Sequence, residues 1–374
     1  MSDALRDLLT RHIDAGTMPG AVGTIGESYE PIAVGLAAPG GPPLQTDAIF
    51  RIQSMTKAIT SVATLRLVQD GVIALDDPVA TWLPELAEPR VLTHADAPLE
   101  NWRPAQHPIT VRHLLTNQSG YGMMTSDSPL RQAMVDAGVD AGAEPVDLGA
   151  KDWLDALSAL PLAFEPGEGW RYHHSFGILG ILLGRVTDRS TEQVLDDTVF
   201  RPSGMRDTGF TVPVDRAHRL PAAFRHRAEG IEQSESAGTG FYVEPAPFDV
   251  SHAELVSTLA DYHAFLRALV DGRLIDAELR AGMTGDQVKP SAKGPDSFFP
   301  GFWENTGWGY GVSVVTDGPH RGRFGWSGGL GTDFFVDPDG TICIIMTQVE
   351  MSDRILALFG DLQGLSGGQP YYES

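Results

Sequence analysis

The chain has 374 residues, of which 42% are hydrophobic, so it can bury the core of one large domain or of two coupled domains. Its formal net charge of −22 disfavours nucleic acid and anionic membranes as partners, because both would repel it. The single cysteine, Cys343, excludes an internal disulfide.

The N-terminal segment, residues 1–13, alternates charged and apolar residues at helical spacing and predicts an amphipathic helix. It lacks the basic start and apolar run of a signal peptide, and no later stretch has the length of a membrane span. We therefore expect a cytoplasmic protein with no membrane partner. A strand is predicted next, at Ala21–Ile25.

Residues 51–60 place Ser54 and Lys57 three positions apart, where an extended segment is expected to run into a helix. Positions i and i+3 share a helix face, so a hydroxyl and an amine would point into the same space. A serine needs a neighbouring base, and a lysine serves as one only where its pKa is lowered, for example by burial. The alternative is a chance S-x-x-K with a solvated lysine. Burial of this helix is predicted by its apolar residues: Ile52, Met55, Ile59, Val62, Ala63 and Leu65.

Two later segments also carry motifs. A Pro/Gly turn at residues 165–169 precedes Tyr172 and an apolar helix that continues to Val186. Residues 323–338 predict two strands joined through glycines. The segment 341–346 predicts a buried strand in which Cys343 is a small core residue, and an amphipathic helix is expected at 353–359.

These segments, with further landmarks along nearly the whole chain, resemble the serine β-lactamase and penicillin-binding-protein superfamily, whose signatures are S-x-x-K, Y-x-N and a K-T-G-like triplet. The chain is most similar to class C β-lactamases and, more closely, to family VIII carboxylesterases. The resemblance implies an α/β (α+β) fold, with an antiparallel sheet flanked by helices and built from both termini. We expect residues 1–79 and 246–374 to form this sheet domain and residues 80–245 to form an inserted, all-helical or mostly helical domain, with the active site between them.

The resemblance also implies roles for individual residues. Ser54 would be the acylated nucleophile, Lys57 its base, and Tyr172 the group that passes the proton to the leaving group. The backbone N–H groups of Ser54 and Gly329 would form the oxyanion hole, where a glycine allows close approach to the substrate. No cofactor and no metal are expected, because the histidines are scattered and no nucleotide-binding loop is present.

Three positions depart from the family pattern. Trp326 stands where β-lactamases have the lysine of the triplet, which removes a charge and favours uncharged esters over β-lactams. His174 stands where they have asparagine, and it would either hydrogen bond substrate or lysine, or cap the helix; His173 is expected to pack or to lie at the surface. Glu254 replaces the usual glycine, as a surface substitution or as a residue that narrows the pocket.

Residues 325–329 also match G-x-S-x-G, which would make Ser327 the nucleophile of an α/β-hydrolase. That fold places its acid and histidine after the serine, whereas the last histidine here is His320, so no triad can follow. Loops are expected at 232–247 and 289–305. Aromatic residues on turns, each equally consistent with packing, are candidates to frame the substrate: Tyr121, Phe241, Tyr242, Phe248, Phe298, Phe299, Phe302 and Trp303.

The sequence therefore predicts a cofactor-independent carboxylesterase that acts on short-chain or small aromatic esters, with the small-molecule ester as its partner. Four alternatives stay open. A β-lactamase, a D-amino-acid peptidase or an acyltransferase would use the same residues, and a ligand-binding relative would acylate slowly or not at all.

Overall fold

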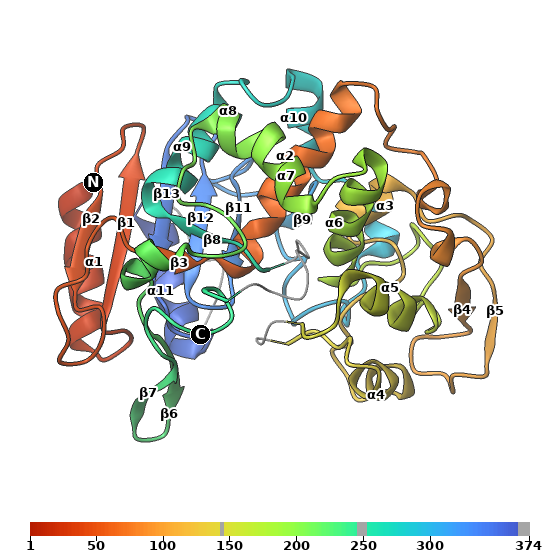
Figure 1. The fold of residues 1–374 in the computed structure, drawn as a ribbon, viewed down its shortest axis with the longest axis horizontal. Helices are drawn as coiled ribbons and strands as arrows, with labels where there is room; N and C mark the ends of the chain where they lie inside the picture. The colour runs from red at the N-terminus through yellow and green to blue at the C-terminus, as the bar shows by residue number, and fades with distance from the viewer. Residues whose placement is uncertain (143–145, 245–252, 366–374) are drawn as a thin grey trace.

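The computed structural model describes residues 1–142, 146–244 and 253–365. At its centre is a seven-stranded antiparallel sheet of strand order β2-β1-β13-β12-β11-β10-β9 (Figure 1). Both ends of the chain supply it, since Val22 pairs with Met346. The expected fold class is thereby confirmed. The strands are β1 (Gly20–Gly26), β2 (Ile32–Gly35), β9 (Thr306–Trp308), β10 (Ser313–Val315), β11 (Phe324–Gly328), β12 (Thr332–Val336) and β13 (Ile342–Met346).

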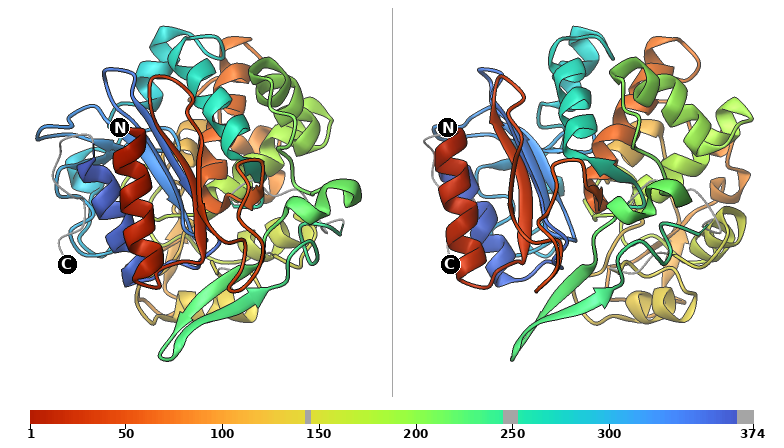
Figure 2. Two further views of the ribbon diagram at one scale, coloured as in Figure 1. Left: turned by 90° about the vertical axis from the view of Figure 1, so that its left-hand side faces the viewer. Right: turned by 60° about the vertical axis from the view of Figure 1, so that its left-hand side comes forward.

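One face of the sheet is covered by the two terminal helices, α1 (Ser2–Asp14) and α11 (Asp353–Gly364), which lie side by side (Figure 2). Successive strand residues point to opposite faces. Phe335 and Cys343 accordingly join the core under these helices, whereas Phe334 joins the core on the other face. The prediction that Cys343 is a buried core residue is confirmed.

The other face packs against α2 (Thr56–Gln69) and α9 (Leu259–Val270). Eleven of the fourteen residues of α2 are buried, so this helix runs through the interior and has no solvent face of its own. The burial predicted for its apolar residues is confirmed, since Ile59, Val62 and Leu65 have no exposed surface. Any polar side chain at the start of α2 is consequently held away from water.

The middle of the chain forms a mainly helical region beside the sheet (Figure 1). It also contains two short hairpins that the sequence did not predict, and β7 occupies the start of the expected loop 232–247. The expected domain limit at 245/246 and Phe248 lie outside the described residues, and the division into domains stays a prediction. The remaining elements are α3 (Val111–Leu115), α4 (Pro129–Asp136), α5 (Ala150–Ser158), α6 (His174–Thr187), α7 (Thr191–Leu195), α8 (Arg201–Ser203), α10 (Ala277–Met283), β3 (Ile49–Arg51), β4 (Arg90–Leu92), β5 (Trp102–Pro104), β6 (Ala223–Arg227), β7 (Gly230–Glu235) and β8 (Val256–Thr258).

Candidate active site

Ser54 lies in a single 3-10 turn, Gln53–Met55, between β3 and the start of α2. Gln53 has a φ of 48°, a left-handed conformation that side-chain-bearing residues rarely adopt. This sharp reversal leaves Ser54 half-buried at the N-terminus of α2, whereas the neighbouring residues of the turn are buried. The positive end of the helix dipole therefore lies at the serine, which favours negative charge there.

The sheet fixes this turn in place through β11 and β12. A Cβ atom on Gly328 would lie 2.3 Å from the Ile52 carbonyl oxygen, so only glycine allows β11 to approach the turn this closely. The Thr332 hydroxyl donates a hydrogen bond of 3.1 Å to the same carbonyl. The position of Ser54 is thus set by strands that lie about 270 residues further along the chain.

Lys57 is directly beside the serine, as the i, i+3 spacing predicts. Its Nζ donates a 3.0 Å hydrogen bond to Ser54 Oγ and lies 4.6 Å from the centre of the Tyr172 ring. The side chain has no exposed surface, and this burial lowers the pKa of Lys57 to about 7, against the negative charge of Glu254, which raises it. A lysine in this state can accept the proton of a serine near neutral pH.

Tyr172 completes the group from the segment that leads into α6. Its hydroxyl shares a hydrogen bond with Ser54 and accepts one of 2.6 Å from Trp326 Nε1. Burial raises the pKa of Tyr172, although both hydrogen bonds act in the opposite direction. The hydroxyl therefore keeps its proton at neutral pH and is available as a proton donor.

Gly329 follows β11 and is exposed, next to Gln53. A Cβ atom built on Gly329 would lie 3.7 Å from Gln53 Oε1, an ordinary contact, so neighbouring side chains do not force a glycine here. Its carbonyl accepts a 2.8 Å hydrogen bond from the Met351 N–H. The contribution of the Gly329 N–H group to an oxyanion hole stays a prediction.

An aromatic wall stands beside Tyr172 and Trp326, and much of it comes from the irregular segment 289–305. The ring of Phe298 lies 5.0 Å from that of Tyr172, and the ring of Trp308 lies 4.7 Å from that of Trp326, centre to centre. Trp170 and Trp308 were not predicted from the sequence as part of the site. Trp170 stands two residues before Tyr172, a spacing that puts both side chains on one face of an extended segment. The wall consists of Trp170, Phe298, Phe302, Trp303 and Trp308.

Contacts of the chain hold this wall in place. The carbonyl oxygen of Asp296 accepts hydrogen bonds from the Thr125 hydroxyl, at 2.9 Å, and from the Arg171 guanidinium, at 2.5 Å. Trp303 Nε1 donates to Ser297 Oγ at 2.7 Å. The segment that carries Phe298 is therefore stabilised by a hydrogen bond within the segment and by hydrogen bonds from Thr125 and Arg171.

His174 and Tyr121 are held by the helical region. His174 Nε2 shares a 2.7 Å hydrogen bond with the Val139 carbonyl, and its ring stacks on Trp153. Tyr121 is 4% exposed and belongs to the main hydrophobic core. These contacts give both side chains packing roles, and their contact with a substrate stays a prediction. His173, which precedes α6 with a φ of 93°, is buried.

Ser327, the serine of the G-x-S-x-G match, has a different partner. Its hydroxyl donates a 2.7 Å hydrogen bond to Asp333 Oδ1 on the neighbouring strand. Because strand residues alternate, Ser327 points away from the face on which Trp326 meets Tyr172. Burial raises the pKa of Asp333 to about 7, the hydrogen bond from Ser327 notwithstanding.

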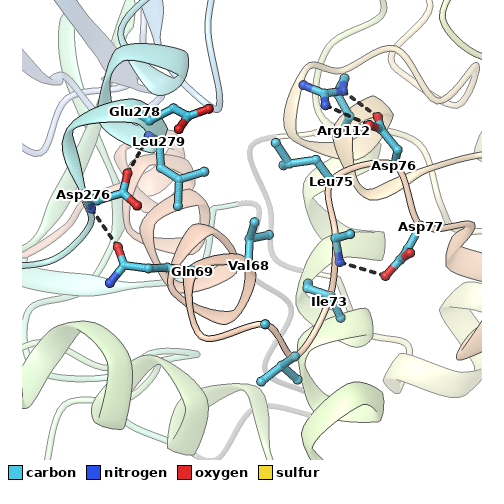
Figure 3. Close-up of a pocket in the computed structure, with 13 residues that line it drawn as sticks. Val68, Gln69, Ile73, Leu75, Asp76, Asp77, Arg112, Asp276, Glu278 and Leu279 are labelled. Carbon is cyan, nitrogen blue, oxygen red and sulfur yellow. Dashed lines mark hydrogen bonds and ion pairs between the residues drawn. The ribbon is translucent and has the colours of Figure 1, made fainter.

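A pocket of about 590 Å³ lies at the other end of α2 from Ser54 (Figure 3). It is lined by apolar side chains, including Val68, Ile73 and Leu279, and by the Asp76–Arg112 ion pair, whose closest atoms are 2.8 Å apart. The length of α2, about 20 Å at 1.5 Å per residue, separates it from the serine. In the described part of the chain, no cluster of three or more metal-binding side chains occurs and no helix is long and apolar enough to cross a membrane.

Comparison with known proteins shows the family to which this chain belongs. A family model named Beta-lactamase matches residues 5–353. Protein Rv1367c of Mycobacterium tuberculosis is 34% identical over 353 residues, which cover 89% of this chain and 86% of that protein. Esterase EstB of Burkholderia gladioli is 31% identical over 322 residues, which cover 79% of this chain and 76% of EstB.

Among solved structures, a similar fold is found in EstCE1, described as a hydrolase with promiscuous acyltransferase activity. The two chains superpose with a TM-score of 0.79 over 96% of each, at 25% sequence identity. The fold therefore matches over nearly the full length of both proteins.

Proposed function

Since the chain belongs to the beta-lactamase family, we propose that it is a carboxylesterase that cleaves its substrate through an acyl-enzyme on Ser54. The observation that carries this proposal is the 3.0 Å hydrogen bond between Ser54 Oγ and the Nζ of a wholly buried lysine, Lys57. The esterase-type relatives support the more general statement that the chain is a serine hydrolase.

Lys57 is the general base of the acylation step. Because burial lowers the pKa of Lys57 to about 7, a large fraction of the lysine is uncharged near neutral pH. It takes the proton of Ser54 as Oγ attacks the carbonyl carbon of the ester. The backbone N–H groups of Ser54 and Gly329 bind the resulting oxyanion, and the N-terminus of α2 favours its charge.

Tyr172 is the general acid for the leaving alcohol. Burial raises the pKa of Tyr172, so the phenol carries the proton that the departing alkoxide needs. The protonated Lys57 then returns a proton to Tyr172. In deacylation this lysine–tyrosine pair accepts the proton of the water that attacks the acyl carbon. It then returns a proton to Ser54 Oγ as the bond between Oγ and the acyl carbon breaks, which releases the carboxylic acid and regenerates the serine.

The substrates are uncharged esters of short-chain or small aromatic acids. Trp326 presents an indole where a β-lactamase would present a cation, so a substrate carboxylate has no cationic partner at that position. The aromatic wall beside Tyr172 offers apolar contacts to an acyl or alcohol group. An uncharged ester satisfies both features, whereas a β-lactam antibiotic with its carboxylate does not.

Acyl transfer is a second candidate function. It uses the same acyl-enzyme, with an alcohol or amine in place of water, and EstCE1 is described as combining hydrolysis with acyltransferase activity. An alcohol added to the ester assay separates the two functions. Formation of a new ester at the expense of the acid supports transfer, and formation of the acid alone limits the protein to hydrolysis.

The nucleophile is tested by intact-mass labelling with a fluorophosphonate probe, which needs no knowledge of the substrate. We expect stoichiometric labelling of the wild type, no labelling of Ser54→Ala, and normal labelling of Ser327→Ala, the matched serine on β11. The same three proteins are then assayed with p-nitrophenyl butyrate and with a chromogenic cephalosporin. The wild type and Ser327→Ala are expected to turn over the ester but not the cephalosporin, and Ser54→Ala is expected to turn over neither.

Each part of the proposal has its own contrary outcome. Label retained in Ser54→Ala but lost in Ser327→Ala would show that the nucleophile is Ser327 and not Ser54. A folded wild type that takes no label would be a binding protein rather than an esterase. Faster turnover of the cephalosporin than of the ester would make the protein a β-lactamase.

A further inference from the structure

Glu254 is a buried carboxylate beside the Ser54 turn, and it has no part in the proposed steps of Ser54, Lys57 and Tyr172. Only 4% of the residue is exposed. The next residue, Leu255, is bonded to both ends of the turn, since its carbonyl accepts from the Ile52 N–H at 3.0 Å and its N–H donates to Thr56 Oγ1 at 3.3 Å. These bonds hold Glu254 against the segment that carries Ser54 and Lys57.

A carboxylate in this position is costly unless a compensating group lies nearby, because burial disfavours an isolated charge. One of its oxygens accepts a 2.8 Å hydrogen bond from the Ala253 N–H. Its charge also acts on two buried side chains, where it raises the pKa of Lys57 against the larger effect of burial and adds to the burial that raises the pKa of Tyr242. Tyr242 in turn accepts a 3.0 Å hydrogen bond from Gln53 Nε2, so Glu254 belongs to the surroundings of the turn.

We propose that Glu254 is a positioning residue whose carboxylate stabilises the protonated form of Lys57 that arises during acylation. This inference rests on the proposed function. As the Ser54 Oγ–H bond breaks, the oxygen forms its new bond to the carbonyl carbon and the carbonyl π pair moves to the oxyanion. The proton forms an N–H bond with the Lys57 lone pair, so the lysine becomes an ammonium ion in the field of Glu254.

Neutral groups that lie close to Lys57 include the Ser54 hydroxyl and the rings of Tyr172 and Phe176. Glu254 adds a negative charge that acts on the same amine. Arg51, whose guanidinium lies 5.6 Å from the centre of the Tyr242 ring, is paired with Glu235 at 2.7 Å. That pair is neutral as a unit, whereas the charge of Glu254 raises the pKa of Lys57.

Glu254→Gln tests the inference because it keeps the size of the side chain and removes the charge. The measurement is the rate of fluorophosphonate labelling of Ser54 across a series of pH values. In the wild type the rate is expected to rise through about pH 7, since Lys57 must be uncharged to accept the proton. Without the neighbouring carboxylate the lysine loses its proton more easily, so the midpoint moves to lower pH by about half a unit or more.

Glu235→Gln is the matched control, because it removes a nearby carboxylate that is paired with Arg51 instead of acting on Lys57; its midpoint is expected to stay at the wild-type value. Glu254→Asp, which retains a charge, is expected to lie between wild type and Glu254→Gln. If Glu254→Gln does not fold, Glu254→Gly provides the same comparison with the residue usual in the resembling family.

The results distinguish this inference from the proposed function. A wild type whose labelling does not depend on Ser54 contradicts the proposed function itself. A wild type labelled at Ser54, together with a folded charge-free variant whose midpoint is unchanged, overturns the role of Glu254 and leaves the esterase proposal standing. A general loss of structure would lower the rate at every pH without moving the midpoint.

Discussion

At the scale of single residues, the contact that distinguishes this site is the hydrogen bond from Trp326 Nε1 to the Tyr172 hydroxyl, at 2.6 Å. The indole thereby occupies one lone pair of the phenol oxygen and sets the direction in which the phenol proton can be donated. Trp326 thus donates a hydrogen bond to Tyr172 in addition to offering an apolar surface.

Trp326→Phe removes this donor and keeps an aromatic ring. We expect kcat for p-nitrophenyl butyrate to fall about tenfold, the effect of losing one neutral hydrogen bond at a reacting group, with little change in KM. Trp303→Phe is the matched control, since Trp303 Nε1 donates to Ser297 in the same wall. Equal losses in the two variants would mean that the wall acts only by packing.

The sequence was sufficient to predict that Ser54 and Lys57 lie together, because three-residue spacing on a helix determines that contact locally. The burial of Glu254 was not predictable in the same way. It depends on Ile52 and Thr56, about 200 residues earlier in the chain, which bond to the residue that follows Glu254. The residues next to Glu254 in the sequence do not predict that its side chain is buried.

At the scale of elements, the site depends on how closely β11 packs on the turn before α2. Gly328 and Gly329 are adjacent, but their surroundings differ. A Cβ atom on Gly328 would lie 2.3 Å from both the Ile52 carbonyl oxygen and Thr332 Oγ1, whereas one on Gly329 would lie 3.7 Å from Gln53 Oε1. Only the first position must be glycine for the two elements to fit.

Gly328→Ala is therefore expected to lower the free energy of unfolding by about 1–3 kcal/mol, the usual cost of overpacking, and to slow labelling of Ser54. Gly329→Ala is expected to unfold at the same urea concentration as the wild type. Urea denaturation and fluorophosphonate labelling measure both effects. Similar denaturation curves for the two variants would show that β11 can move away from the turn.

Several elements of the fold were predicted from hydrophobic patterns, including β1, α2, α6, β12 and α11. The β6–β7 hairpin was not predicted, because most residues of its two strands are charged or polar, for example Arg225 and Glu232. It is held by tertiary contacts with the C-terminal part of the chain, for example the 2.7 Å bond from the Phe224 N–H to the Gln348 carbonyl. The local sequence of these strands lacks the alternation of apolar and polar residues that would predict them.

At the scale of the whole molecule, the net charge of −22 imposes self-repulsion on the folded state. Raising NaCl from about 0.02 M to about 0.5 M is expected to raise the melting temperature near pH 8, because the added salt screens this repulsion. Near pH 5, close to the pI of 4.7, the same addition is expected to have a smaller effect. Equal shifts at both pH values would mean that the salt acts through burial of apolar surface rather than through charge.

The arrangement of the whole molecule came from the family resemblance, since hydrophobic patterns alone do not say which strands are neighbours. In the sheet, β1 lies between β2 and β13, so a strand that begins at residue 20 pairs with one that ends at residue 346.

On the ribosome, β1 is therefore made long before its second neighbour exists. It must wait, with its edge unpaired, while more than 300 further residues are synthesised, and unpaired edges promote aggregation. The last strand closes the sheet late, and contacts between distant parts of a chain form slowly. A message truncated before Ile342 would yield a protein with an open sheet edge, and such a product is expected to depend on chaperones or to be degraded.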